Sequence, residues 1–239
     1  MPIESSRTLI PTAAVALLAL TSFGPAAAPA DPVAGNPTAG AAQTCDGAGW
    51  TVRDDGGFEN AIGWSNTVTD GLYVDRFDFG SGSDDIFLRA CVHLTRAGTD
   101  DSVDLALIFW SLDGPGGDPG TELASKPAVA KVVPAFPLAE FYDFEVTSLR
   151  LAAEGSWGVG MRWNPQSDQG FFIGIDESPG SAFTDPMGSS DSGMNWDSVI
   201  NGIPNIRTTS IRVQTGPDPT IFSDGFESGD TSSWSGVVF

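Results

Sequence analysis

Short runs of alternating apolar and polar residues follow one another from Trp50 to Thr215, and hardly any stretch has the spacing of an amphipathic helix. Strict alternation places the two sets of side chains on opposite faces of a strand. The predicted strands are Trp50–Arg53, Leu72–Phe79, Ile86–Thr95, Val103–Trp110, Ala128–Val133, Phe141–Val146, Trp157–Trp163, Phe171–Ile175 and Ile206–Gln214. About nine short strands separated by Gly, Pro, Asp and Asn clusters predict an all-β fold, a two-sheet antiparallel β-sandwich.

The alternation also predicts which side chains enter the core. In Ile86–Thr95 the even-numbered residues are all apolar and the odd-numbered ones are mixed, so His93 is expected on the second face of its strand. Trp157 and Trp163 have the same parity and are expected to share a core face.

Two connections have a distinct composition. The segment Ser111–Ser125 contains the turn formers Asp-Gly and Asp-Pro-Gly, which predict a long loop between two strands. Helix is expected only in short pieces, for example at Asp197–Asn201.

The first 30 residues have the pattern of a secretory signal peptide. Arg7 precedes an apolar run from Leu9 to Leu20, and small residues follow up to Ala30. The run is too short to span a bilayer, and no later stretch reaches the necessary length. Residues 31–44 contain almost nothing that could pack, so we expect a flexible leader before a β-sandwich domain at 45–216.

Cys45 and Cys91 are the two cysteines of the chain. An exported protein meets an oxidising compartment, which favours a disulfide between them over two buried free thiols. The bond would hold the start of the folded region against an interior strand.

Charge excludes several classes of partner. The chain has 239 residues, with 11 Lys and Arg against 31 Asp and Glu, for a net charge of −20. It has no basic patch that could bind a nucleic acid backbone or an anionic membrane surface. We expect an acidic, monomeric extracellular protein with neither a nucleic acid partner nor a membrane span.

Catalysis is not expected. Serine chemistry needs a general base, and the single histidine, His93, is interpreted as a structural residue. No G-x-S-x-G elbow is present. Paired carboxylates could cleave glycosides, but with 31 acids some pairs will be close by chance, so a hydrolase is the weakest hypothesis.

Aspartates in the turns offer a structural calcium ion as a further hypothesis. Calcium takes oxygens from carboxylates and loop carbonyls, and the pairs Asp54, Asp55 and Asp84, Asp85 lie in predicted turns. No EF-hand spacing occurs, and the alternative is that these aspartates only form turns and keep the surface solvated.

Two tryptophans are candidate sugar platforms. Flat aromatic faces stack on pyranose rings while nearby polar groups bind the hydroxyls. Trp110 leads into the long loop that carries Asp113 and Asp118, and Trp196 lies in a polar segment. These four residues are the candidate ligand-binding set, and the alternative for each tryptophan is a place in the core.

Several phrases resemble a known class of module. In chain order these phrases are GGFENAIGWS (Gly56–Ser65), YVDRFDF (Tyr73–Phe79), LALIFWSLDGPGGDPGTEL (Leu105–Leu123), WGVGMRW (Trp157–Trp163) and FFIGIDE (Phe171–Glu177). Their order resembles that of accessory β-sandwich modules of secreted bacterial proteins, which are similar to jelly-roll carbohydrate-binding domains. The resemblance implies a jelly-roll-like sandwich and a carbohydrate ligand.

The end of the chain carries a second resemblance. Residues 217–239 are expected to form a linker and a tail, and the phrase IFSDGFESGDTSSWS from Ile221 is similar to a C-terminal IFxDGFExGDxxxWS tail of many secreted bacterial proteins. The tail also repeats the Gly-Phe-Glu and Trp-Ser of the domain's own start. A detached sorting or processing tail and an extra strand of the sandwich are the two interpretations.

The sequence therefore predicts a secreted, non-catalytic binding module with carbohydrate or a cell-surface glycan as its ligand. The alternative is an extracellular structural or envelope protein without a small-molecule ligand.

Overall fold

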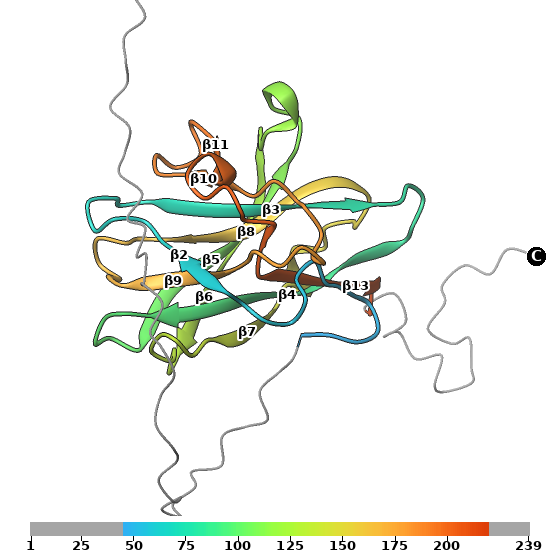
Figure 1. Cartoon of the computed structure of the whole chain (residues 1–239). Helices are drawn as coiled ribbons and strands as arrows, with labels where there is room; N and C mark the ends of the chain where they lie inside the picture. The colour runs from blue at the N-terminus through green and yellow to red at the C-terminus, as the bar shows by residue number, and fades with distance from the viewer. Residues whose placement is uncertain (1–44, 220–239) are drawn as a thin grey trace, which may run out of the picture.

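The structure, a computed structural model, describes residues 45–219, and this part of the chain is built from β-strands and three short 3-10 helices (Figure 1). The elements in chain order are β1 (Trp50–Thr51), β2 (Asn60–Ile62), β3 (Gly71–Phe79), β4 (Asp85–Arg96), β5 (Ser102–Ser111), η1 (Pro115–Gly117), β6 (Glu122–Lys131), β7 (Glu140–Glu145), η2 (Thr147–Leu149), β8 (Gly155–Trp163), β9 (Phe171–Asp176), β10 (Met187–Ser189), β11 (Asp197–Ser198), η3 (Val199–Asn201), β12 (Thr208–Thr209) and β13 (Ile211–Pro217).

The strands form two antiparallel sheets, which confirms the predicted β-sandwich. A seven-stranded sheet has the order β1-β13-β4-β9-β12, with β7 paired to β4 and β2 paired to β9. A six-stranded sheet has the order β11-β10-β3-β8-β5-β6. In Figure 1 the β5–β6 hairpin, with η1 near its tip, projects from the top of the sandwich, and β13 runs beside β4.

One large apolar cluster fills the space between the sheets. Strands β3, β5 and β8 direct their odd-numbered side chains into it, among them Phe77, Phe109 and Val159, each 0% exposed. Trp157 and Trp163 belong to the same cluster, as their shared parity predicted.

A β-bulge in β4 changes which residues enter the core. Gln214 pairs with Arg89 but Thr215 pairs with Phe87, so Leu88 is an extra residue in the ladder. A bulge shifts the alternation by one position. Phe87 therefore joins Ala90 in the core while Leu88 is half-buried, and the prediction that Leu88 lies on the core face and Phe87 on the other was wrong.

Other differences concern the ends of elements. The predicted loop Ser111–Ser125 is shorter, because β6 begins at Glu122 and pairs with β5 along its whole length. The expected helix at Asp197–Asn201 is a two-residue strand followed by the 3-10 helix η3. Strands β2 and β10 were not predicted, and both are only three residues long.

The first residues of the predicted linker belong to the sandwich. Pro217 is the last residue of β13, and Asp218, 4% exposed, accepts a hydrogen bond from Arg150 at 2.5 Å. The predicted signal peptide, leader and tail lie outside the described residues. Within residues 45–219 no helix is long and apolar enough to cross a membrane.

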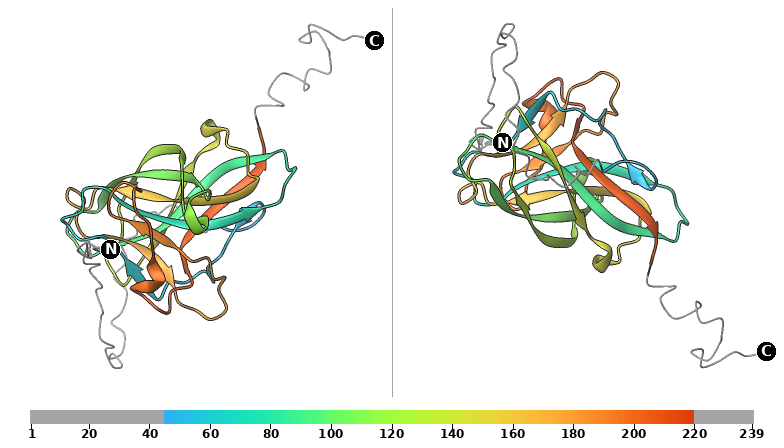
Figure 2. Two further views of the ribbon diagram at one scale, coloured as in Figure 1. Left: turned by 90° about the horizontal axis from the view of Figure 1, so that it is seen from above. Right: turned by 90° about the horizontal axis from the view of Figure 1, so that it is seen from below.

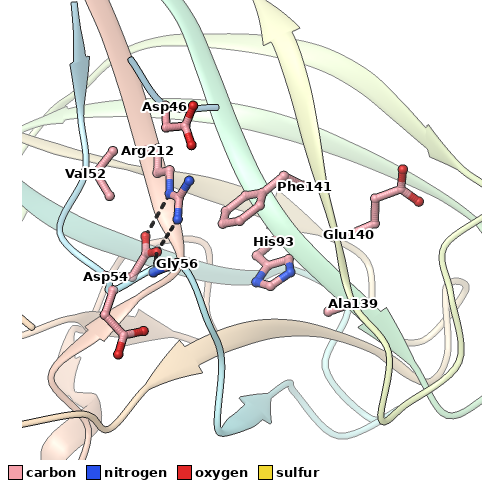
Figure 3. A pocket seen from close by; sticks show the side chains of 10 residues that line it. Asp46, Val52, Asp54, Gly56, His93, Ala139, Glu140, Phe141 and Arg212 are labelled. Atoms are coloured by element: carbon pink, nitrogen blue, oxygen red, sulfur yellow. Dashed lines mark hydrogen bonds and ion pairs between the residues drawn. The ribbon is translucent and has the colours of Figure 1, made fainter. Parts of the chain in front are cut away.

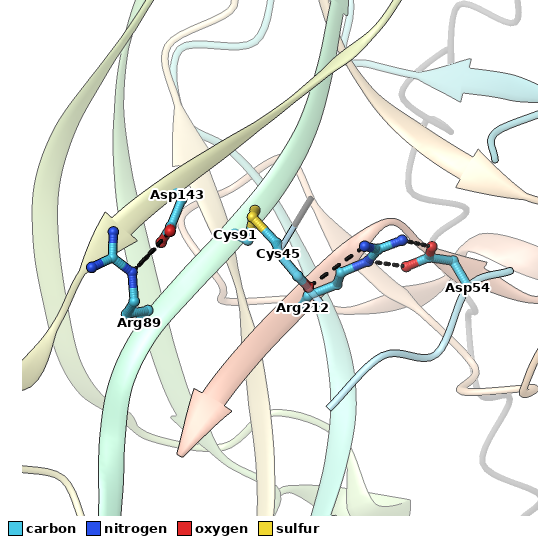
Figure 4. The surroundings of a disulfide bond; sticks show 6 residues. All are labelled: Cys45, Asp54, Arg89, Cys91, Asp143 and Arg212. Carbon is cyan, nitrogen blue, oxygen red and sulfur yellow. Dashed lines mark hydrogen bonds and ion pairs between the residues drawn. A yellow bond between two sulfur atoms is a disulfide. The ribbon is translucent and has the colours of Figure 1, made fainter. Parts of the chain in front are cut away.

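Residues 45–59, which we call the strap, include the edge strand β1, and the segments before and after β1 cover the outer face of the seven-stranded sheet. The disulfide between Cys45 and Cys91 of β4 fastens one end, which confirms the predicted bond (Figure 4). Farther along, Asp54 pairs with Arg212 of β13, and the ring of Phe58 packs edge-on against His93. Figure 2 shows the sandwich from above and below, with β13 beside β4 in the second view.

Candidate binding pocket

The site is built on the outward-facing residues of three neighbouring strands. Cys91 of β4 is in register with Arg212 of β13, and His93 is in register with Phe141 of β7. Residues two apart on a strand face the same side, so these four side chains point away from the core. The strap covers them.

Asp54 and Arg212 form a buried ion pair beneath the strap. The Arg212 side chain is 3% exposed and the Asp54 side chain 0%. Nε of Arg212 donates to Oδ2 of Asp54 at 3.0 Å, and Nη2 donates to Oδ1. Nη1 makes a longer contact of 3.5 Å with the Cys45 carbonyl. The two charges satisfy each other in the paired geometry that a buried pair requires.

Phe141 is enclosed on both faces. The His93 ring is stacked on it at 4.0 Å between centroids, with 8° between the planes. The guanidinium carbon of Arg212 is also 4.0 Å from the Phe141 centroid. Two groups so close to one ring have room only on opposite faces, so Phe141 is sandwiched and offers neither face to a ligand.

His93 is a buried, neutral side chain. It is 6% exposed, and burial is the main cause that lowers its pKa to about 4; the charge of Arg212 lowers it as well, against raising effects from Asp54 and the backbone of Ala139. Nδ1 is buried beside Gly174 of β9 and has no hydrogen-bond partner in the described part of the chain.

These groups surround a pocket of about 390 Å³ between the strap and the sheet (Figure 3). Its lining comes from the strap, from one residue each of β4 and β13, and from the first residues of β7 with the residue before them. The lining residues are Asp46, Val52, Asp54, Asp55, Gly56, His93, Ala139, Glu140, Phe141 and Arg212. Asp46, Asp55 and Glu140 are exposed, whereas Asp54, His93 and Arg212 are buried. The pocket thus has a buried floor and a rim of carboxylates.

The predicted calcium ligands do not come together. Asp54 is bound to Arg212 instead, and a cation would compete with that guanidinium for the same oxygens. Asp84 and Asp85 lie at the far end of β4, eight residues from His93 or about 26 Å along the strand. These four aspartates therefore do not form one site: Asp54 is paired with Arg212, Asp55 lies nearby, and Asp84 and Asp85 lie at the other end of β4.

Asp55 instead joins Glu59 and Asp176 in what we call the acidic trio, whose carboxylate oxygens lie within 4.8 Å of one another. Burial together with the charges of Glu59 and Asp176 raises the pKa of Glu177 beside them. Asp176 is 0% exposed, and its oxygens accept hydrogen bonds from the Asp55 N–H, the Ser178 N–H and the Ser181 hydroxyl. The lone pairs with which Asp176 could coordinate an ion are thus largely occupied by these hydrogen bonds.

Of the two predicted sugar-platform tryptophans, Trp110 is buried and Trp196 is half-buried. Trp110 is 5% exposed and packs edge-to-face on Trp196 at 5.3 Å, in a small apolar cluster on the outer face of the six-stranded sheet. Gly193 covers Trp110 closely, because a Cβ there would come within 2.6 Å of the indole. The expected exposure of Trp110 was wrong. Asp113 and Asp118 lie in the β5–β6 turn, where Asp113 accepts a hydrogen bond from Ser111.

Sequence reasoning missed Arg212, Phe141 and Glu140. Arg212 did carry a signal, because it interrupts an apolar strand between Ile211 and Val213, and a charge in such a strand needs a partner. The sequence does not say which of 31 acids that partner is. Nothing in the pattern marked Phe141 or Glu140.

Fold and pocket together define a β-sandwich with an acceptor-rich pocket on the outer face of one sheet. No protein-family model matches the chain, and no curated protein sequence matches it. Among solved structures it is similar to one that contains the cysteine protease and lectin-like domains of Cwp84, a surface layer associated protein of Clostridium difficile. The identity is 9%, the TM-score 0.49, and the match covers 72% of this chain and 37% of that one.

Proposed function

We propose that this chain is a secreted, non-catalytic carbohydrate-binding module and that the strap pocket is its site. The observation that carries the proposal is the pocket itself, about 390 Å³ with four carboxylates and a neutral histidine around it. That volume is within the usual range for small-molecule sites. Carboxylates are strong acceptors for hydroxyl groups, and sugars present many hydroxyls.

The disulfide supports an extracellular location. Disulfides persist in oxidising compartments and are rare in the cytosol. Cys45 and Cys91 are paired in the structure, and the described residues contain no free cysteine.

The side chains of the pocket favour binding over turnover. None of its ten lining residues is a serine, threonine, cysteine, lysine or tyrosine, so only His93 and the carboxylates are left as reactive groups. The buried carboxylate, Asp54, is held by Arg212. Incubation with polysaccharides and peptides is expected to release no products, and products whose formation is lost in Glu140→Gln would overturn this part of the proposal.

The test of binding is a glycan array probed with the full secreted chain, followed by titration calorimetry on the glycans retained. We expect binding that Glu140→Gln weakens, because Glu140 is exposed at the rim and its replacement leaves the fold intact. Glu154→Gln is the matched control, since Glu154 is exposed and precedes β8 in the other sheet. Retention of no glycan would instead favour the structural or envelope protein.

A further inference from the structure

Apolar side chains gather on the connection between β6 and β7. Residues 132–138 have the sequence Val-Val-Pro-Ala-Phe-Pro-Leu, without a polar side chain, and we call them the apolar loop. Val132 is 72% exposed and Leu138 is 67% exposed, and Ala135 and Pro137 are exposed as well. Among the large apolar side chains of residues 45–219, only Met194 is more exposed. Single exposed apolar residues are ordinary, whereas several on one short segment are typical of an interaction surface.

The backbone of the apolar loop is held in place by neighbouring strands. The N–H of Val133 donates to the Asp101 carbonyl at 2.8 Å, and Nε of Arg96 donates to the Val133 carbonyl at 2.7 Å. At the other end the hydroxyl of Thr95, a residue that is 0% exposed, donates to the Leu138 carbonyl at 2.6 Å. The exposed side chains are therefore presented by an ordered backbone, which lowers the entropy that a partner must offset on binding.

The stability of the fold does not explain the valine at position 132. Its φ is 61°, in the left-handed region, where a β-branched residue is a genuine outlier. Such a conformation costs free energy, and a side chain that is 72% exposed recovers little of that cost by burial. Residues strained in this way cluster at functional sites. Contact with a partner outside the chain accounts for Val132 better than contact within the fold.

Exposed carboxylates lie at both ends of the apolar loop. Glu140 follows the loop by two residues, and Asp101 adjoins its start through the backbone hydrogen bond, with Asp100 beside it. Burial, and after it the charges of Glu140 and Asp101, raise the pKa of Tyr142, which places both carboxylates near one phenol.

Two cations lie near these carboxylates. Lys131 is exposed directly before the loop, whereas Arg96 is half-buried and directs Nε and Nη1 at the carbonyls of Val133 and Gly98. The local excess of negative charge is therefore small, and the larger contribution is the net charge of −20. The field of such a chain attracts basic partners and repels both anionic surfaces and a second copy of itself.

We propose that the apolar loop is a docking surface for a protein that presents aliphatic side chains beside lysine or arginine. Leu138 and Val132 supply the apolar contact, and the carboxylates at the two ends of the loop face the basic residues. Seven residues span at most about 25 Å, so one partner surface of ordinary size reaches both ends. The proposal goes beyond glycan binding, for which aliphatic side chains offer no hydrogen-bonding group.

The experiment probes the full secreted chain on an array of short peptides that combine leucine or serine with lysine or glutamate. Fluorescence anisotropy then gives the affinity for the peptides retained. We expect retention on leucine–lysine peptides, about tenfold weaker binding to serine–lysine peptides, and none to leucine–glutamate peptides. Higher salt is expected to weaken the binding.

Variants locate the surface. Leu138→Ser is expected to weaken binding of the leucine–lysine peptides about tenfold, whereas Leu123→Ser, at a 47% exposed leucine on β6, is the matched control and should not. Asp101→Asn is expected to weaken binding about threefold, and Asp197→Asn, at an exposed residue of β11, should change nothing. Circular dichroism melting of each variant separates lost binding from lost folding.

Val132 has a test of its own. Val132→Asn places in the left-handed region a residue that tolerates it, so we expect a higher Tm together with weaker peptide binding. A lower Tm with unchanged peptide binding would show that Val132 serves the fold and would overturn its place in the docking surface.

Three other results would overturn the proposal as a whole. Equal affinity for leucine–lysine and serine–lysine peptides would show charge attraction alone. Equal losses in Leu138→Ser and Leu123→Ser would show that the loop is not the surface. Binding to phosphatidylcholine vesicles that Leu138→Ser abolishes, without peptide binding, would show a loop that inserts into lipid instead. Leu138 is not among the lining residues of the strap pocket, so none of these results bears on glycan binding.

Discussion

Two buried groups should give the stability of this protein opposite responses to pH. Asp75 of β3 points into the core at 1% exposure, where its carboxylate accepts hydrogen bonds from the hydroxyls of Thr184, Thr208 and Thr209. Burial dominates those hydrogen bonds and raises the pKa of Asp75 from 3.8 to about 6. Burial lowers the pKa of His93 from 6.5 to about 4.

The direction of each effect follows from proton binding. Asp75 holds its proton more tightly in the folded state, so its contribution to stability is fully present below pH 3.8 and is lost as the pH rises through about 6. His93 holds its proton less tightly when folded, so its contribution is present above pH 6.5 and is lost as the pH falls through about 4. Acidification from pH 7 to pH 4 thus gains one contribution and loses the other.

The magnitudes nearly cancel. One pKa unit corresponds to about 1.4 kcal/mol, so each group changes the free energy of unfolding by about 2.5 to 3 kcal/mol over this range. The two contributions therefore nearly cancel in the pH dependence of the wild-type free energy of unfolding, to which the many surface carboxylates also contribute. The difference between the wild type and a variant removes that shared background.

Urea unfolding at pH 7 and at pH 4, with the disulfide intact, tests both groups. Asp75→Asn should cost about 2.5 kcal/mol more at pH 4 than at pH 7, because only the wild type gains stability on protonation. His93→Gln should behave in the opposite way and become about 3 kcal/mol less costly at pH 4. Mutational costs that are equal at the two pH values would refute the assignment of these pKa directions.

Three further predictions concern the edge strand, the disulfide and calcium. Edge strand β6 carries Pro127 and both lysines of the chain, residues that discourage pairing with another sheet, so Pro127→Val with Lys131→Val should increase the mass that light scattering measures relative to the wild type. The disulfide closes a separation of 46 residues, so Cys45→Ser with Cys91→Ser should lower the free energy of urea unfolding by roughly 4 kcal/mol; a loss below about 1 kcal/mol would contradict this. Calcium should leave the Tm unchanged, because hydrogen bonds already occupy the buried carboxylate of the acidic trio; a rise that Asp55→Asn abolishes would restore the calcium hypothesis.

Period-two alternation was enough to predict the sandwich, because each long strand has one face against the core. It failed at Leu88, where the extra residue of the bulge is defined only by the partner strand β13. It also failed to find β10 and β11, which are too short for a pattern: β10 pairs with the edge of β3, and β11 pairs with β10.

The candidate site could not be predicted from the sequence for a different reason. Asp54 and Arg212 are 158 residues apart, and only the folding of the strap across the sheet brings them together. The same limitation affected Trp110, whose expected exposure ignored Trp196 and Gly193, two residues that return from a distant segment to cover it. Local pattern identifies the face of a strand but not what covers that face.

What covers the outer face also explains why polar residues are buried there. An ion pair such as Asp54 with Arg212 is often no more stabilising than apolar residues of the same shape, because desolvation offsets the attraction. An apolar filling under the strap would serve stability equally well, yet it would not direct three guanidinium nitrogens at fixed oxygens. The pair instead holds the strap in one position and uses up the donors of Arg212, while Phe141 is enclosed between Arg212 and His93. The groups left facing the pocket are then acceptors and negative charges.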